Sequence, residues 1–160
     1  MPERIYSYPP IVDENCAALI LGTMPSVKSL EDGFYYAHPR NAFWPILADI
    51  FGEEKPVTIE EKKSLLLRHH IALWDTAASC VREGSLDSAM RDVALNDIAG
   101  LLSRYPRLEK IFVNGGEAER LLRRALPHPP IPVVRLPSTS PAYTMSYEKK
   151  LAAWREALFR

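Results

Sequence analysis

Short apolar runs alternate along the chain with longer segments in which apolar residues recur every three or four positions. The runs have the length of buried strands and cover residues 17–21, 71–74, 111–113 and 132–136. The longer segments have the periodicity of helices with one buried face and cover residues 42–51, 59–69, 96–104, 117–126 and 147–159. Strands that alternate with helices predict a parallel sheet covered on both faces. We therefore expect a three-layer α/β/α fold around a central, mainly parallel four-stranded sheet.

The length and composition fit one domain over residues 1–160. The chain is 47% hydrophobic and 25% charged, and its twenty acidic and twenty basic residues give a formal net charge of zero. Charge alone therefore neither favours nor excludes a nucleic-acid partner. No apolar run approaches the roughly 20 residues of a membrane-spanning helix, and the first residues lack a secretory pattern. Cys16 and Cys80 have no metal-ligand spacing and form no obvious disulfide framework. We therefore expect a reducing, cytoplasmic setting, with no metal and, given the lack of a long apolar run, no membrane.

The segments that follow the strands are the places to look for chemistry, because ligands of open parallel sheets bind beyond the carboxyl ends of the strands. The first such segment is Gly-Thr-Met-Pro-Ser at residues 22–26, directly after the first run. A glycine followed by Pro-Ser gives a tight polar turn at that edge. The same residues also end ordinary strands, so this turn has a structural interpretation as well.

The connection at residues 35–44, YYAHPRNAFW, is unusually polar and aromatic. Its two tyrosines point in opposite directions if the backbone is extended, so only one need face the sheet edge. Asn41 is placed to cap the helix predicted from residue 42, because an asparagine side chain accepts a backbone N–H at that position. Phe43 and Trp44 fit the hydrophobic core. Composition alone leaves a functional and a purely structural interpretation open.

Two further loops carry hydrogen-bonding groups. Asn114 ends the third run, and its amide offers a donor and an acceptor that could read a base edge or bond locally in a turn. Residues 137–141, Pro-Ser-Thr-Ser-Pro, hold hydroxyl groups between two prolines, an arrangement suited to phosphate but also found in ordinary turns. A serine nucleophile is not expected, because the chain has no G-x-S-x-G elbow and no histidine lies beside this loop.

Taken together, these segments resemble the uracil-DNA glycosylase superfamily, and most closely its hypoxanthine-DNA (deoxyinosine) glycosylase branch. GTMPSVKS, YYAHPRNAFW, IFVNGG and LPSTSPA follow the order of that family, and ALWDTAASCVREGSLDSAM is similar to the same branch. The likeness runs from about residue 19 to residue 154, and YYAHPRNAFW is its specific part. A related form of that string belongs to the mismatch-specific uracil and thymine glycosylases.

The resemblance implies a DNA-repair enzyme whose partner is DNA containing a deaminated base, with hypoxanthine favoured. Such an enzyme extrudes the base from the duplex and hydrolyses its N-glycosidic bond without a cofactor. By this analogy Tyr36 would stack on the base and Asn114 would hydrogen-bond the base edge. The backbone amides of Thr23 and Met24 would contact the base as well.

The catalytic residue implied by the resemblance is Asn41, which would hold the attacking water or donate to the leaving base. Many superfamily members carry Asp or Asn where this chain has Met24, which cannot orient a water, and the hypoxanthine branch uses an asparagine of the PRN segment instead. His38 is a second candidate donor, with a structural turn as its alternative. No lysine matches a Schiff-base position, so we expect a monofunctional monomer that leaves the DNA strand intact.

The resemblance also implies contacts with the DNA backbone. The candidate residues are Ser26, Ser138 and Ser140, with Lys28 and Lys149 as phosphate partners. The same likeness covers Asp87 and Ser88, which either touch substrate or stabilise a turn, whereas Asp75 has a structural interpretation.

Three other functions compete with this one. The first is a mismatch-specific uracil-DNA glycosylase. The second is a catalytically silent DNA-binding module of the same fold, which Met24 makes credible. The third is a small-molecule hydrolase that uses Ser138 or Ser140, which would require a base near those hydroxyl groups.

Overall fold

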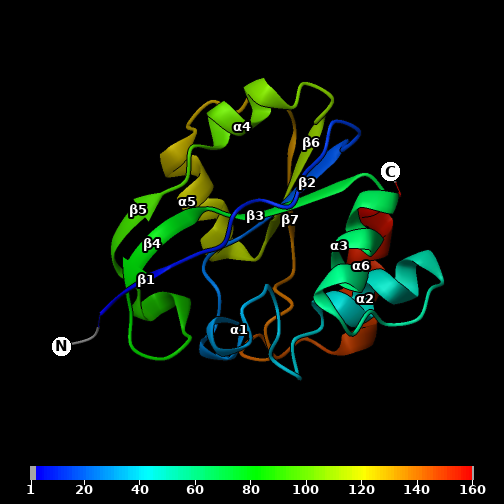
Figure 1. The fold of residues 1–160 in the computed structure, drawn as a ribbon, viewed down its shortest axis with the longest axis horizontal. Coiled ribbons are helices and arrows are strands. Elements are labelled where there is room, and N and C mark those ends of the chain that lie inside the picture. The colour runs from blue at the N-terminus through cyan, green and yellow to red at the C-terminus, as the bar shows by residue number, and fades with distance from the viewer. Residues whose placement is uncertain (1–2, 160) are drawn as a thin grey trace.

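The central element of the fold is a parallel four-stranded sheet. The computed structural model describes residues 3–159, and Figure 1 shows how its helices and strands are arranged. The strands are β2 (Ala18–Gly22), β3 (Ile71–Asp75), β6 (Lys110–Asn114) and β7 (Val133–Leu136), in the order β3-β2-β6-β7. Every neighbouring pair is parallel. These strands coincide with the four apolar runs to within one residue at each end, so the predicted sheet is confirmed.

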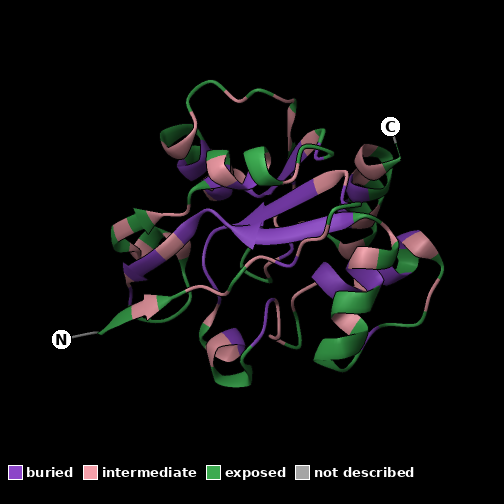
Figure 2. Ribbon diagram, turned by 45° about the horizontal axis from the view of Figure 1, so that its top comes forward, coloured by how far each residue is buried: buried purple, intermediate pink, exposed green. Residues whose placement is uncertain are grey.

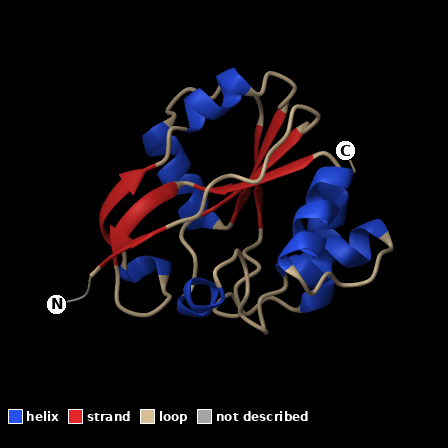
Figure 3. Ribbon diagram, in the orientation of Figure 1, coloured by secondary structure: helices blue, strands red, loops and turns tan. Residues whose placement is uncertain are grey.

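Helices cover both faces of this sheet, which confirms the three layers. On one face lie α2 (Phe43–Phe51), α3 (Ile59–Arg68) and α6 (Tyr147–Leu158). On the other face lie α4 (Ile98–Arg104) and α5 (Gly116–Ala125). Figure 3 shows the two groups of helices on opposite sides of the strands. All five predicted helices are present, with ends that differ from the prediction by at most two residues.

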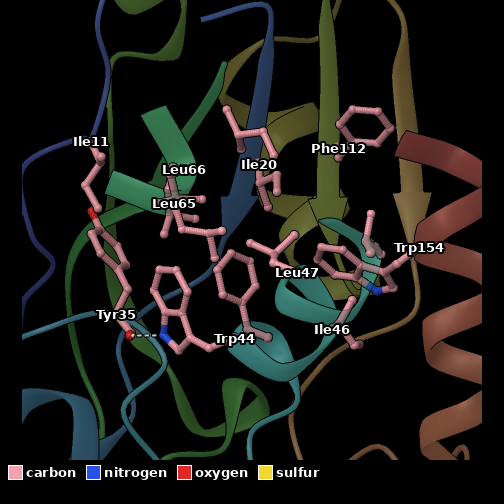
Figure 4. Close-up of a cluster of buried hydrophobic side chains, with 14 of the residues drawn as sticks. Ile11, Ile20, Tyr35, Trp44, Ile46, Leu47, Leu65, Leu66, Phe112 and Trp154 are labelled. Carbon is pink, nitrogen blue, oxygen red and sulfur yellow. Dashed lines mark hydrogen bonds between the residues drawn. The ribbon is translucent and has the colours of Figure 1, made fainter. Parts of the chain in front are cut away.

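The apolar runs of the sequence are explained by two hydrophobic cores. Ile20 of β2 packs with α2, α3 and α6, in the cluster drawn in Figure 4. Its neighbours Leu19 and Leu21 pack against α4 and α5 on the opposite face. Successive strand residues point to opposite faces, so a strand covered on both sides is apolar at every position. Figure 2 shows the central strands buried along most of their length.

A second, three-stranded sheet extends from the first and was not predicted. It consists of β1 (Arg4–Tyr6), β4 (Ala77–Val81) and β5 (Arg91–Leu95), antiparallel in the order β1-β4-β5. Only Thr76 separates β3 from β4, so the two strands follow each other without a turn signal in the sequence. Strands β1 and β5 are partly exposed and carry charged residues, which weakens the apolar pattern on which the prediction depended.

Two short helical segments also escaped the prediction, and one predicted cap is displaced. The short segments are α1 (Val27–Asp32) and the single 3₁₀ turn η1 (Asp87–Ala89). Helix α2 begins at Phe43, so its N-cap position falls on Ala42, and the expected N-cap at Asn41 is wrong by one residue. The expected interaction is nevertheless formed, because Asn41 Oδ1 accepts the backbone N–H of Phe43 at 2.9 Å.

No helix within residues 3–159 is long and apolar enough to cross a membrane. Cys16 and Cys80 are buried free thiols. Burial raises the pKa of both thiols, that of Cys16 to about 11, so both are held in the weakly reactive protonated form.

Candidate active site

A cavity of about 270 Å³ opens at the carboxyl end of the central sheet. Its walls come from the ends of β2, β3 and β6, the loop after β7, the connection before α2, and the loop between β4 and β5. The lining residues are 22–26, 29, 35, 36, 41, 75, 85–87, 114, 138–140, 142 and 143. In Figure 1 the connection before α2, in cyan, and the segment after β7, in orange, both pass close to α1 at this end. Parallel sheets bind their ligands at this edge.

A hydrogen-bonded network joins three walls of the cavity. Asn114, at the end of β6, donates from Nδ2 to the Tyr36 hydroxyl at 3.2 Å and to Thr139 Oγ1 at 3.0 Å. Its Oδ1 accepts the backbone N–H of Thr139 at 3.0 Å. Both hydrogens of the amide are therefore engaged, and one lone pair of Oδ1 remains. The network fixes the loop after β7 and the Tyr36 hydroxyl relative to the sheet.

Tyr36 is held in a single orientation by its backbone and by a stacked neighbour. Its φ angle is 52°, in the left-handed region that a bulky residue rarely adopts. Its ring stacks on Phe43 of α2, with ring centroids 4.1 Å apart and planes at 22°. Burial, reinforced by the charge of Asp75, raises the pKa of the Tyr36 hydroxyl, which stays protonated. Both tyrosines border the cavity, but Tyr35 is buried in the core and its hydroxyl donates to the backbone carbonyls of Tyr8 and Pro9.

Asn41 lines the cavity from the start of α2. Because Oδ1 accepts the Phe43 N–H, the orientation of the amide is fixed and its other end is Nδ2. The Nδ2 group donates no hydrogen bond to any residue in the range 3–159. Asn41 therefore offers a preoriented N–H donor at the cavity wall.

A buried arginine ties two loops of the cavity together. Arg82, at the end of β4, donates from Nε to the Gly84 carbonyl at 2.8 Å and from its guanidinium to the Pro25 carbonyl. Thr23 Oγ1 donates to Asp87 Oδ1 at 2.7 Å across the same gap. The loop after β2 and the loop before β5 are thus held in a fixed relation.

Asp75 ends β3 at the base of the cavity and is 2% exposed. Its Oδ2 is buried and has no hydrogen-bond partner in the part of the chain that the structure describes. The pKa of Asp75 is raised to about 8, mainly by burial; the nearby charge of Asp87 acts in the same direction, and Arg82 opposes the shift. Burial also raises the pKa of Asp87, although its hydrogen bond from Thr23 acts in the opposite direction. Asp75 is a buried acid without a counterion in contact with it.

Comparison with known proteins agrees with this geometry. The family model described as the uracil DNA glycosylase superfamily matches residues 9–159, nearly the whole chain. The chain belongs to this superfamily. The resemblance given by the short sequence motifs is therefore confirmed over residues 9–159.

Individual members of the superfamily are similar along their entire length. A hypoxanthine DNA glycosylase of Methanosarcina acetivorans is 38% identical over 157 residues, which are 96% of each chain. A hypoxanthine DNA glycosylase of Methanosarcina barkeri is 34% identical, over 96% of this chain and 97% of the relative. A solution NMR structure from Methanosarcina acetivorans, which carries a provisional uracil DNA glycosylase name, matches with a TM-score of 0.82 and 32% identity. That match covers 99% of this chain and all of the other.

The cavity brings together most of the residues singled out in the sequence. They come from four separate segments of the chain and are Thr23, Met24, Ser26, Tyr36, Asn41, Asn114, Ser138 and Ser140. The serine side chains accept backbone N–H groups in local turns; that of Ser26 caps α1. Each hydroxyl of the loop after β7 is thereby fixed near the mouth of the cavity.

Three predicted residues lie outside the cavity lining. His38 Nδ1 accepts the backbone N–H of Arg40 at 3.1 Å, which gives the His-Pro pair a structural part in the turn before α2. Lys28 forms an ion pair with Asp32 one turn along α1, and Lys149 is exposed on α6. Neither lysine lines the cavity.

Several residues that shape the site carry no clear signal in the sequence. Arg82 gave no signal beyond being a charged residue after an apolar stretch. Leu86 and Tyr143 are exposed apolar side chains at the cavity wall, with 59% and 46% of their surface accessible. Lys150 is buried, and its Nζ donates to the Ser140 carbonyl at 3.0 Å, which anchors the loop after β7 to α6.

The Gly22→Ala substitution is expected to disturb the site directly. A Cβ at Gly22 would lie 2.5 Å from the Tyr36 hydroxyl oxygen and 2.7 Å from Asp75 Oδ1, so both side chains would have to move. Overpacking of this kind lowers the free energy of unfolding by about 1–3 kcal/mol, which urea denaturation would measure. The double variant with Tyr36→Phe removes one clashing oxygen and should recover part of the loss. A Gly22→Ala protein as stable as the wild type would contradict the close approach.

Proposed function

We propose that this protein is a DNA glycosylase that hydrolyses the N-glycosidic bond of a deaminated base, with hypoxanthine as the favoured base. The observation that carries the proposal is that Tyr36, Asn41 and Asn114, far apart in sequence, line one cavity. Membership of the superfamily and the names of the two Methanosarcina relatives support the same activity.

The cavity supports a mechanism in which the base leaves the duplex before reaction. A stacked base is out of reach of a pocket in a sheet edge, so it must be extruded at a cost of a few kcal/mol. Phe43 covers one face of the Tyr36 ring, and the flipped base would stack on the other face. Leu86, Tyr143 and the serines near the cavity would contact the surrounding DNA, with Lys28 and Lys149 as more distant phosphate partners.

The hydrogen bonds of Asn114 sharpen its proposed part in base recognition. With both Nδ2 hydrogens engaged, only an acceptor lone pair on Oδ1 remains for a ligand. Hypoxanthine carries a hydrogen on N1, where adenine has an acceptor. An acceptor held in place therefore favours the deaminated base and leaves adenine unpaired.

Asn41 is the proposed catalytic residue. Bond cleavage gives the sugar oxocarbenium character and places negative charge on the departing base, and preorganised donors stabilise such charge. The engagement of Oδ1 by Phe43 supports a donor role for Nδ2, toward the base or the oxygen of the attacking water. Met24 adds apolar surface to the lining of the same cavity. His38 lies outside the lining, and we assign it no catalytic step.

The proposed enzyme works as a cytoplasmic monomer without a metal or cofactor and leaves the DNA strand intact. One copy of the chain supplies every group that the proposed reaction uses, so a single copy is sufficient for it. Hydrolysis by water needs only donors and an acid, and the cavity lining offers both types of group.

A panel of oligonucleotides tests the proposal. Duplexes and single strands would carry one inosine, uracil, xanthine or unmodified adenine, and base loss would be scored as strand breaks after alkali. We expect strand breaks at inosine that appear only after alkali treatment, and no breaks at adenine. Ready release of uracil with none of hypoxanthine would replace the proposal with a uracil-specific glycosylase. Binding of inosine-containing DNA without any base release would indicate a silent DNA-binding module.

A further inference from the structure

Asp75 is the one fully buried acid in the lining of the cavity, and neither its sequence context nor its hydrogen bonding explains it. The carboxyl group ends β3, and Oδ1 lies against Gly22 beside the Tyr36 hydroxyl. The other oxygen, Oδ2, is buried and finds no hydrogen-bond partner among residues 3–159. A buried polar group without a partner lowers stability, so its retention points to an interaction with a ligand.

The groups around Asp75 keep its carboxyl neutral. Asp87, from η1, is the acid whose charge acts on Asp75, and Asp75 in turn interacts with the hydroxyl groups of Tyr8, Tyr35 and Tyr36. Arg82 is the nearby cation, but its hydrogen bonds go to the carbonyls of Pro25 and Gly84. An acid that is buried beside another acid, without a bonded cation, favours its protonated form. The pKa of about 8 follows from this arrangement.

We propose that Asp75 is the general acid of the reaction and gives its proton to the departing purine. The inference rests on the proposed glycosylase function and adds a second catalytic residue to Asn41. As the bond from C1′ to the base breaks, its electron pair passes to the base, and the Asp75 proton moves to a basic atom of that base. Water adds to C1′, and the proton it loses restores the acid, directly or through solvent. The net reaction consumes one water and releases one neutral base.

A proton donor is needed most where the leaving group is poor. A base that departs without a proton carries a full negative charge, and a positioned acid removes that charge in the transition state. Asp75 and Asn41 line the same cavity from different elements, at the end of β3 and at the start of α2. One group can therefore serve the base while the other serves the water.

The test is the pH dependence of single-turnover release of hypoxanthine from an inosine-containing duplex. An acid that must be protonated loses its action as the pH rises through its pKa. The wild-type rate should therefore be level below pH 7 and fall about tenfold per pH unit above the pKa of Asp75. Asp75→Asn keeps the shape and a donor but has no transferable proton. Its rate at pH 7 should be about 100-fold lower, without the alkaline fall.

Asp92→Asn is the matched control, because Asp92 is exposed on β5 and its φ of 50° suits asparagine. This variant should keep the wild-type rate and profile. An Asp75→Asn enzyme with the wild-type rate and alkaline fall would overturn the role of Asp75 and leave the glycosylase function intact. A wild type that releases no base from any lesion would overturn both. If Asp75→Asn does not fold, the test uses the wild-type enzyme alone. A plateau rate that is equal in D₂O and H₂O, together with no fall in rate above pH 8, would overturn the proposal.

Discussion

Asn41→Ala is expected to lower the single-turnover rate of hypoxanthine release about 100- to 1,000-fold, the effect of losing one preorganised donor. DNA binding should stay close to that of the wild type, because the wall formed by Tyr36, Asn114 and the loop after β7 does not depend on Asn41 for its hydrogen bonds. The rate would be measured with enzyme in excess, and binding by fluorescence anisotropy on inosine-containing DNA. Lost turnover with retained binding separates the enzyme from a silent binding module.

Asn41→Asp provides the control for this substitution. A carboxylate can still accept the Phe43 N–H at the start of α2, and a negative charge is favourable there, so the local structure is kept. What the variant lacks is the N–H donor. If Asn41 acts by donating, Asn41→Asp should be as slow as Asn41→Ala. Near wild-type turnover of Asn41→Asp would instead indicate that the residue at this position activates the water by accepting a hydrogen bond from it.

The parallel sheet could be predicted because burial on both faces leaves a simple pattern. Strand β2 is apolar at every position, since Leu19 and Ile20 enter different cores. Strands β1 and β5 have no such constraint, and their charged, half-exposed residues look like loop. Strand β4 follows β3 after a single residue, so no turn marks its start. The periodicity of the sequence therefore does not reveal the second sheet.

The site was predictable as a set of loops but not as a set of interactions. The rule for parallel sheets directed attention to Tyr36, Asn41 and Asn114, and these residues do share a cavity. The sequence does not show that Asn114 donates both amide hydrogens, one to Tyr36 and one to Thr139. The importance of Asp75 likewise depends on what surrounds it in three dimensions. An aspartate beside a tryptophan in an apolar strand has no distinctive pattern of its own.

Asp75→Asn should stabilise the protein at alkaline pH even as it slows the reaction. The pKa of Asp75 rises from 3.8 in the unfolded chain to about 8 in the folded protein. Between these values the folded protein holds a proton that the unfolded chain has lost, so stability falls as the pH rises through the window. Asparagine does not titrate and escapes this loss. The variant should gain on the order of 3–5 kcal/mol over the wild type by pH 8, and close to nothing at pH 4.

Urea denaturation of both proteins at pH 4, 6 and 8 would measure this difference, with Asp92→Asn as the exposed control. For a chain of this length the gain at pH 8 corresponds to roughly 10 °C in Tm. A gain that grows with pH identifies the ionisation of Asp75 as its source, whereas a constant offset would indicate altered packing. Equal stability at pH 8 would mean that the folded protein accommodates the carboxylate, and the acid would then have no proton to give. Lower activity together with higher alkaline stability is the signature of an acid retained for chemistry at the expense of the fold.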